Sequence, residues 1–370
     1  MPPADLDQLL ADFRQARDAC ERSLVDLSLN RRRVKEWLQS VADDAGPDEV
    51  VDLYGERDVV TNFEREIAEL LGKEAAVFMS SGTMAQQIAL RIWADRQGSR
   101  RVAFHPTCHL ELHEQKGYAA LHHLEGVLVG SASEVIDLDA LKQIPGRIAA
   151  LLLELPQREI GGQLPSWDGL RAQTAWAREH EVRLHLDGAR VWEAAPAMKR
   201  SYAEVAALFD SVYVSMYKGV GGITGAVLAG SADFIAEARL WQQRHGGRLI
   251  RVFPFVIAAR RALRERLPRF PLYHERAVKL AEAIWSIPGI RLVPDPPQSH
   301  MMHVYVPGSH EVLLQRATQI ARTEKVALFR NILPSDVPGY CKTEMEMGED
   351  ALSVSDAEAG DLFRTLVRID

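Results

Sequence analysis

A lysine in a glycine-rich loop is the residue of this sequence best suited to covalent chemistry. Lys218 follows the apolar run Ser211–Ser215, and three of the next four residues are glycine. An amine that forms a Schiff base needs a fixed position at a strand end, and glycine leaves room for a flat ring beside the backbone. A solvated loop lysine is the alternative interpretation, because most lysines are exposed.

An aspartate lies at the end of another apolar run, about thirty residues earlier. Asp187 belongs to His185-Leu186-Asp187-Gly188-Ala189-Arg190. A carboxylate facing a pyridine nitrogen keeps that nitrogen protonated, which lets the ring accept electrons from a carbanion. A helix N-cap is the alternative role for this aspartate.

Two further motifs follow predicted strands. Ser80-Ser81-Gly82-Thr83 stands before a predicted helix, where small hydroxyl residues and free N–H groups suit a phosphate. His109, in Cys108-His109-Leu110, is suited to stack on a cofactor ring or to transfer a proton. An ordinary helix cap and a structural histidine are the respective alternatives.

The elements that position these motifs form an alternating pattern of helices and short apolar strands. This pattern predicts an α/β fold with a mostly parallel sheet, in which ligands bind beyond the carboxyl ends of the strands. The motifs at Lys218 and Asp187 therefore fall on one edge. The predicted strands are Ala75–Met79, Val102–Phe104, Ile148–Glu154, Arg183–Leu186, Ser211–Ser215 and Gly225–Ala229; the predicted helices are 63–71, 83–97, 167–180 and 231–245.

Three domains are expected. Residues 1–55 are expected to form a helical arm and linker, because helical periodicity runs over 4–39. Residues 56–250 are expected to form the large domain. Residues 251–370 predict a smaller α+β domain. Its predicted elements are helices 252–266, 271–286 and 309–323, strands Ile290–Val293, Met301–Val306 and Thr343–Met347, and a final helix from Ser355.

Taken together, the motifs resemble those of the threonine aldolase and β-eliminating lyase family, fold-type I enzymes that use pyridoxal 5′-phosphate. The resemblance runs from about Tyr54 to Gly247 and rests on three stretches: YGERDVVTNFEREIAELLGKEAAVFMSSGTMAQQIAL, HLDGAR and SVYVSMYKGVGGITGAVLAGSADFIAEARLWQQRHGG. It implies a Schiff base on Lys218, an Asp187 ion pair with the pyridine nitrogen and stacking by His109. It also implies phosphate binding by Ser81, Gly82 and Thr83.

At the substrate-binding positions, the sequence differs from the family at several residues. Arg190 is expected to reach the ring oxygen or the substrate carboxylate, and Tyr54 matches a position that approaches a neighbouring subunit's site, so a homodimer or homotetramer is implied. Gln157 replaces a family histidine that addresses the substrate hydroxyl, and an amide is no base at neutral pH. Arg158 is a candidate anion ligand, and Lys342 is the nearest match to the family's carboxylate-binding arginine.

The implied reaction is cleavage of a β-hydroxy-α-amino acid, such as threonine or allo-threonine, to glycine and an aldehyde. A β-eliminating or other amino-acid lyase is the alternative enzyme, and a non-catalytic scaffold or sensor of the same fold is the alternative outside catalysis. The sequence leaves open the substrate, the stereochemistry at Cβ, the carboxylate ligand and the choice between dimer and tetramer.

The net charge and the cysteine content limit which ligands and which cellular location we expect. The net charge of −7 gives no basic stripe for nucleic acid, so small molecules are the expected ligands. Three separated cysteines without CxxC pairing predict free thiols and a cytoplasmic protein, and we expect no metal site. Residues 1–17 are too polar for a signal peptide, and no apolar run is long enough to span a membrane.

Overall fold

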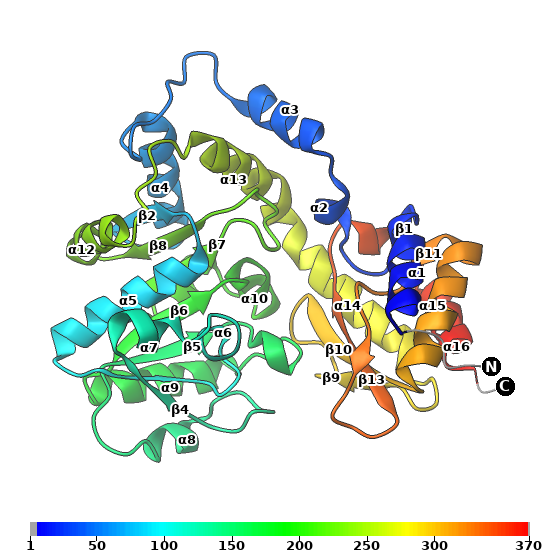
Figure 1. Ribbon diagram of the computed structural model, residues 1–370. Helices are drawn as coiled ribbons and strands as arrows, with labels where there is room; N and C mark the ends of the chain where they lie inside the picture. Colours follow the sequence, from blue (N-terminus) through cyan, green and yellow to red (C-terminus); the bar gives the residue numbers. More distant parts are fainter. Residues whose placement is uncertain (1–5, 369–370) are drawn as a thin grey trace. The chain divides into compact units, whose positions relative to one another are not determined.

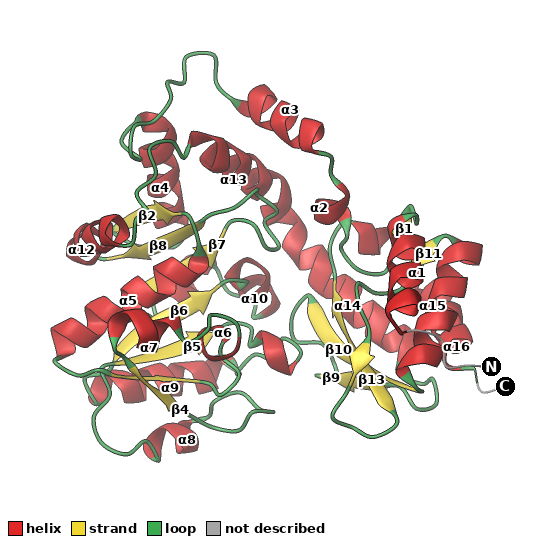
Figure 2. Ribbon diagram, viewed as in Figure 1, coloured by secondary structure: helices red, strands yellow, loops and turns green. Residues whose placement is uncertain are grey.

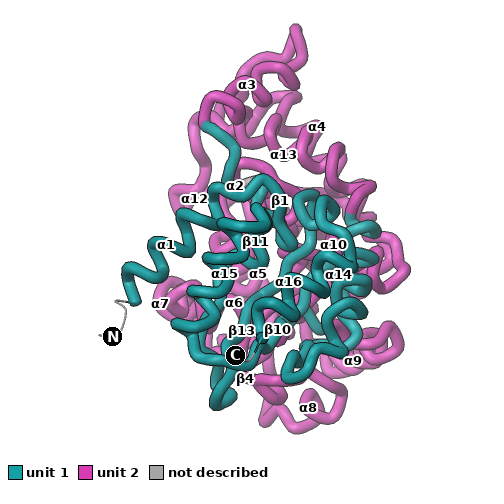
Figure 3. The backbone as a smooth tube through the Cα atoms, turned by 90° about the vertical axis from the view of Figure 1, so that its right-hand side faces the viewer, with its two compact units in different colours: residues 1–33, 161–163, 270–370 teal, residues 34–160, 164–269 magenta. Residues whose placement is uncertain are grey.

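The computed structural model describes residues 6–368, which divide into two compact units. Unit 2 comprises residues 34–160 and 164–269, and unit 1 comprises residues 1–33, 161–163 and 270–370 (Figure 3). The predicted arm of residues 1–55 is therefore divided between the units. Instead of continuous helical structure, it contains three separate helices and a short strand; the expected helical residues 4 and 5 lie outside the described part.

Unit 2 is built on a seven-stranded mixed sheet (Figures 1 and 2). The strand order is β2-β8-β7-β6-β5-β3-β4, and all neighbours are parallel except β8, which is antiparallel to both of its partners. The strands are β2 (Ala75–Met79), β3 (Arg101–Phe104), β4 (Glu125–Leu128), β5 (Ala150–Glu154), β6 (Arg183–Gly188), β7 (Ser211–Ser215) and β8 (Ala226–Gly230).

Helices pack against this sheet, and α5 runs across one of its faces in contact with most of the strands (Figure 1). Strands β5 to β8 are almost wholly buried, which explains their apolar sequences. The helices of unit 2 are α3 (Val34–Asp44), α4 (Asp58–Leu70), α5 (Gly82–Gln97), α6 (His109–Leu112), α7 (Gly117–His122), α8 (Leu138–Lys142), α9 (Trp167–Glu179), α10 (Val191–Ala197), α11 (Tyr202–Ala206), α12 (Ala232–Arg244) and α13 (Phe253–Arg266), with 3₁₀ turns Arg158–Ile160 and Leu267–Arg269.

Unit 1 is an α+β structure that contains residues 270–370 of the predicted small domain, whereas the predicted helix 252–266 lies in unit 2 as α13. Its antiparallel sheet has the order β12-β13-β10-β9, and β1 pairs in parallel with β11. The helix α1 packs on α15, and α14 packs on α16. The elements are α1 (Leu6–Asp18), β1 (Arg22–Ser23), α2 (Ser28–Arg31), α14 (Phe270–Ile284), β9 (Arg291–Val293), β10 (Met301–Pro307), α15 (His310–Glu324), β11 (Val326–Ala327), β12 (Leu333–Pro334), β13 (Tyr340–Glu346), a 3₁₀ turn Asp350–Ser353 and α16 (Asp356–Val367).

The direction of the strands in unit 2 determines where its functional residues gather. Strands β2, β3, β5, β6 and β7 all run the same way, because β8 reverses direction between β2 and β7. Their carboxyl ends therefore meet at one edge of the sheet, where open α/β folds bind ligands.

Candidate active site

The loop that carries Lys218 begins where β7 ends and is held tightly by backbone contacts. The amide of Gly222 donates to the carbonyl of Met216 at 2.7 Å, and the amide of Gly221 donates to the carbonyl of Lys218 at 2.9 Å. A Cβ on Gly222 would lie 2.5 Å from that Met216 oxygen, so only glycine fits there. The loop is thereby fixed as the sequence argument requires.

The amine of Lys218 lies in largely buried surroundings that contain both arginine and carboxyl groups. Burial is the main cause that lowers its pKa, and the charge of Arg190 lowers it further, while Asp187 and Glu154 act in the opposite direction. A lowered pKa increases the fraction of neutral amine, which is the nucleophilic form. This lysine is therefore not the solvated loop residue of the alternative interpretation.

Asp187 is buried on β6, beside the strand that leads to Lys218. Its Oδ1 accepts a hydrogen bond from the amide of Ala189 at 3.0 Å, and its strand neighbours in register are Glu154 on β5 and Tyr213 on β7. The contact with Ala189 is a local turn, which leaves the second carboxylate oxygen for another donor. The position suits a buried cation such as a pyridinium N–H.

The serine and glycine motif lies at the beginning of α5. Ser81 is the N-cap, with its Oγ accepting from the amide of Met84 at 3.2 Å. A Cβ on Gly82 would come within 2.9 Å of Cε2 of Tyr213 and closer still to the phenol oxygen. Thr224, in the Lys218 loop, donates from its hydroxyl to the Ser80 carbonyl at 3.2 Å. The beginning of α5 is therefore in close contact with Tyr213 on β7, the register neighbour of Asp187, and with the loop that carries Lys218.

His109 begins α6 after β3. Its Nδ1 lies 2.9 Å from Oε1 of Glu114, a buried carboxylate that also accepts from Nε2 of Gln87 at 3.3 Å. The negative charge of Glu114 acts on both Tyr213 and Tyr217, so this pair lies close to the strand end that carries Lys218. The imidazole is about one-third exposed, which suits a ring that contacts a ligand.

The remaining predicted residues occupy different surroundings. Arg190 is buried and its charge reaches Lys218, as does that of the part-buried Arg158. Tyr54 lies on the surface, where it contacts Arg248 and Ile250. Lys342 belongs to β13 of unit 1, so its role stays a prediction.

Glu154 is the site residue that the sequence argument missed. It ends β5 in register with Asp187, and burial, then the charge of Asp187, raises its pKa to about 8. Two adjacent buried carboxyl groups do not both ionise easily, so Glu154 holds a proton near neutral pH. Its Oε2 contacts Nε2 of Gln157 at 2.9 Å. Glu154 could have been found from the sequence, because it is an acidic residue that directly follows the apolar run Ala150–Leu153.

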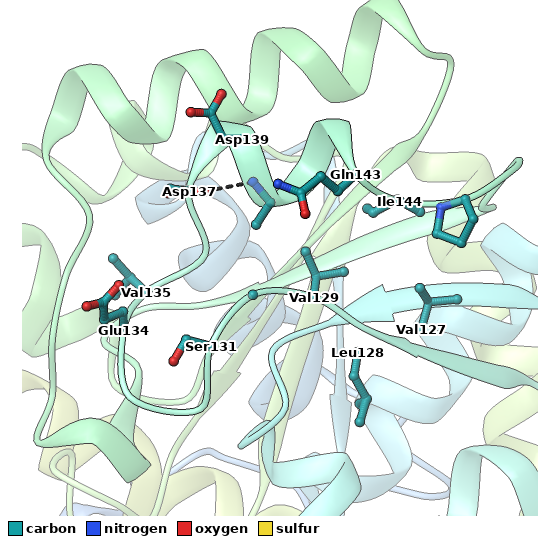
Figure 4. Close-up of a pocket in the computed structure, with 13 residues that line it drawn as sticks. Val127, Leu128, Val129, Ser131, Glu134, Val135, Asp137, Asp139, Gln143 and Ile144 are labelled. Carbon is teal, nitrogen blue, oxygen red and sulfur yellow. Dashed lines mark hydrogen bonds between the residues drawn. The ribbon is translucent and has the colours of Figure 1, made fainter.

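A cavity of about 480 Å³ lies elsewhere in unit 2, beside the edge strand β4 (Figure 4). Val127, Val129 and Gln143 line it, and Asp137 caps the short helix α8 there by accepting from the amide of Ala140 at 2.7 Å. The predicted site residues all lie outside the lining of this cavity.

The residues at the strand ends fit pyridoxal phosphate. A lysine with a lowered pKa, a buried aspartate, a helix N-terminus that excludes a side chain at Gly82 and an accessible imidazole each match one part of that molecule. The fold and this arrangement define a fold-type I enzyme that depends on pyridoxal phosphate.

Comparisons with known proteins assign the family. The beta-eliminating lyase family model matches residues 47–307. A low-specificity L-threonine aldolase of Arabidopsis thaliana is 30% identical over 65% of this chain and 70% of its own length. A Listeria monocytogenes structure assigned as an L-allo-threonine aldolase is 38% identical, covers 97% of this chain and 99% of its own, and has a TM-score of 0.92. The chain belongs to the beta-eliminating lyase family and is a pyridoxal-phosphate-dependent lyase.

More distant structures agree with the fold. A Sphingomonas wittichii serine palmitoyltransferase has a TM-score of 0.61 at 16% identity, with 98% of this chain and 84% of that chain covered. At that identity the likeness concerns the fold alone. Both the predicted fold class and the predicted cofactor are confirmed.

Proposed function

We propose that this protein cleaves a β-hydroxy-α-amino acid, with threonine or allo-threonine as the model substrate, to glycine and an aldehyde. The observation that carries the proposal is the meeting of Lys218, Asp187 and the N-terminus of α5 at one edge of the sheet of unit 2. The threonine aldolase relatives, from Arabidopsis thaliana and Escherichia coli at 30% identity, support the choice of reaction.

The cofactor supplies the electron sink that allows a bond at Cα to break. We assign the chain's own part as follows. Lys218 would offer the amine that holds the cofactor, Asp187 would keep the ring nitrogen protonated, and His109 would cover one face of the ring. Ser81, Gly82 and Thr83 would hold the phosphate at the first turn of α5. Burial and the charge of Asp187 raise the pKa of Glu154, so we propose that Glu154 holds a proton beside Asp187 near neutral pH.

The substrate is a small amino acid with an anionic carboxylate and a β-hydroxyl. Arg190 is buried and close enough for its charge to affect Lys218, so we propose it as a ligand of the ring oxygen or the carboxylate. Arg158, about one-third exposed, is a second anion ligand. Tyr54 completes the proposed substrate contacts from a neighbouring subunit, and the role of Lys342, which belongs to unit 1, stays a prediction.

A β-elimination, which releases ammonia and a keto acid, is the second candidate. The residue that favours it is Gln157, because its amide is committed to Glu154 and Thr107 and provides no base for the substrate hydroxyl.

Product analysis separates the two reactions. The holoenzyme is incubated with L-threonine, L-allo-threonine and L-serine, and glycine, aldehyde, ammonia and keto acid are measured. We expect glycine and acetaldehyde in equal amounts from one of the threonine isomers. Ammonia with a keto acid, and no aldehyde, would overturn the aldolase assignment. A Lys218→Ala variant controls for activity of contaminants.

We also propose that the enzyme is a homodimer or homotetramer. Leu53, Tyr54 and Ile250 are each about half exposed and form a connected surface, since the amide of Tyr54 donates to the carbonyl of Ile250 at 3.1 Å. Exposed apolar patches of this kind are typical of subunit interfaces. Light scattering during size-exclusion chromatography measures the mass, and a monomer of about 41 kDa would contradict the proposal.

Cytoplasmic location is part of the proposal as well. Its support is that Cys20, Cys108 and Cys341 are all buried free thiols, which persist in a reducing compartment. Among residues 6–368, no helix has the length and apolar character needed to cross a membrane.

A further inference from the structure

The structure contains a second accessible imidazole beside His109. His113 follows α6, and its amide donates to the carbonyl of His109 at 2.8 Å, which keeps the two residues one helical turn apart. Their rings lie 5.0 Å apart with a tilt of 48°. The side chain of His113 is 42% exposed, so water can reach it.

A carboxylate fixes the orientation of His113. Its Nε2 lies 2.8 Å from Oε1 of Glu159, and the same oxygen accepts from Nη1 of Arg158 at 2.6 Å. A carboxylate at Nε2 selects the tautomer that carries its proton on Nε2 and leaves Nδ1 as an acceptor. Within the described part of the chain, Nδ1 of His113 has no hydrogen-bond partner.

One ring contact and one charge effect relate this imidazole to the strand ends. One is the ring of His109, and the other runs through Glu159 to Arg158, whose charge contributes to the lowered pKa of Lys218. Arg158 is thus near enough to the amine to act on it. The pair of Glu159 and His113 therefore belongs to the same site, although it comes from the 3₁₀ turn after β5 and the loop after α6.

We propose that His113, oriented by Glu159, removes the proton from the β-hydroxyl of the substrate. This role rests on the aldolase function proposed above and fills the gap left by Gln157. The lone pair of Nδ1 takes the hydroxyl proton, the C–O bond becomes C=O, and the Cα–Cβ bond breaks with its electron pair passing to the glycine fragment. The Cα of that fragment then takes a proton from water, which completes glycine. The imidazolium then releases its proton to water, which its exposure permits.

The test uses a reaction that has no β-hydroxyl. Exchange of the α-proton of glycine in D₂O requires the cofactor and Lys218, whereas cleavage of allo-threonine also requires the hydroxyl base. The variant His113→Asn should lose about 10²- to 10³-fold in kcat for cleavage, the usual effect of a general base, with KM and glycine exchange changed less than about threefold. His180→Asn, which alters an exposed histidine at the end of α9, is the matched control.

A second measurement is independent of turnover. In the holoenzyme labelled with ¹⁵N-histidine, the ring shifts of His113 should report a proton on Nε2, and Glu159→Gln should turn this into a mixture of tautomers. The same variant should reduce the cleavage rate less than His113→Asn does. Restoration of part of the rate by Glu159→Asp is expected, since a carboxylate is retained.

Each outcome decides the role of His113. Wild-type cleavage by His113→Asn would overturn it, and so would equal loss of cleavage and exchange, because the residue would then support the cofactor and not the hydroxyl. An unaltered tautomer in Glu159→Gln would remove the orienting role of Glu159. If wild-type enzyme exchanges glycine but releases no aldehyde from any β-hydroxy amino acid, the proposed function itself fails, and the role of His113 fails with it.

Discussion

The substitution Gly82→Ala tests the proposed phosphate seat most directly. The new Cβ would lie 2.9 Å from Cε2 of Tyr213, and closer to its phenol oxygen, where ordinary contact distances begin near 3.4 Å. Tyr213 is 2% exposed and lies on β7 between two paired strands, so it has little freedom to move. We therefore expect the first turn of α5 to move away from the strand ends.

The size of the effect follows from this displacement. Overpacking a buried position typically costs about 1 to 3 kcal/mol of stability. A charge-assisted hydrogen bond from a backbone N–H to the phosphate contributes roughly 1.5 to 3 kcal/mol, so loss of one such bond corresponds to about 10- to 100-fold weaker cofactor binding.

The assay is equilibrium dialysis of pyridoxal phosphate against the wild type and the variant, with urea denaturation of both. The double variant Gly82→Ala with Tyr213→Phe removes one of the clashing atoms and should recover part of both losses, which makes the effects of the two changes non-additive. If Gly82→Ala binds the cofactor as tightly as the wild type, α5 does not hold the phosphate in the way argued here.

Three further predictions concern groups whose environment the structure specifies. Lys218→Ala should lose the visible absorbance band of the bound cofactor; a band that persists would place the covalent attachment elsewhere. Burial and the charge of Asp187 raise the pKa of Glu154 from 4.5 to about 8, so stability should fall as pH rises between these values, and Glu154→Gln should abolish that fall in urea titrations of the cofactor-free chain. Burial, with the charges of His245 and Arg91, lowers the pKa of His122 from 6.5 to about 4, so stability is lost as pH falls. His122→Phe should reduce the loss between pH 7 and pH 5 by about 2 kcal/mol, and an unchanged pH dependence would contradict the assignment.

The strands were predictable where they are buried on both faces. The run Ala75–Met79 coincides with β2, and Ser211–Ser215 coincides with β7, because a fully buried strand needs an uninterrupted apolar sequence. Strand β4, Glu125–Leu128, was missed because it lies at the sheet edge, where its side chains are exposed or half-buried and carry no such pattern.

In the N-terminal segment, helices could be predicted from the sequence but the pairing of a strand could not. Helical periodicity is local, so it indicated α1 and α3. The pairing of β1 with β11 joins residues about three hundred positions apart, as at Arg22 and Val326. Nothing in the sequence near Arg22 specifies a partner at that distance.

Some residues of the candidate site could be located from local sequence, and others depend on contacts between distant segments. The shared edge of Lys218 and Asp187 could be predicted because each lies at the carboxyl end of an apolar strand, and parallel strands of one sheet end at one edge. Glu154 could not be assigned from β5 alone, because its protonation depends on the register that places it opposite Asp187. His113 and Glu159 come from different loops, and their contact arises only from the folded arrangement.

The surroundings of Lys218 combine groups from several strand ends. Burial is the largest cause that lowers the pKa of its amine; the charges of Arg190 and Arg158 lower it further, while those of Asp187 and Glu154 raise it. Burial also raises the pKa of Glu154, because the charged form of each group loses its hydration. Desolvation at this edge of the sheet therefore favours the neutral amine, which is the nucleophilic form.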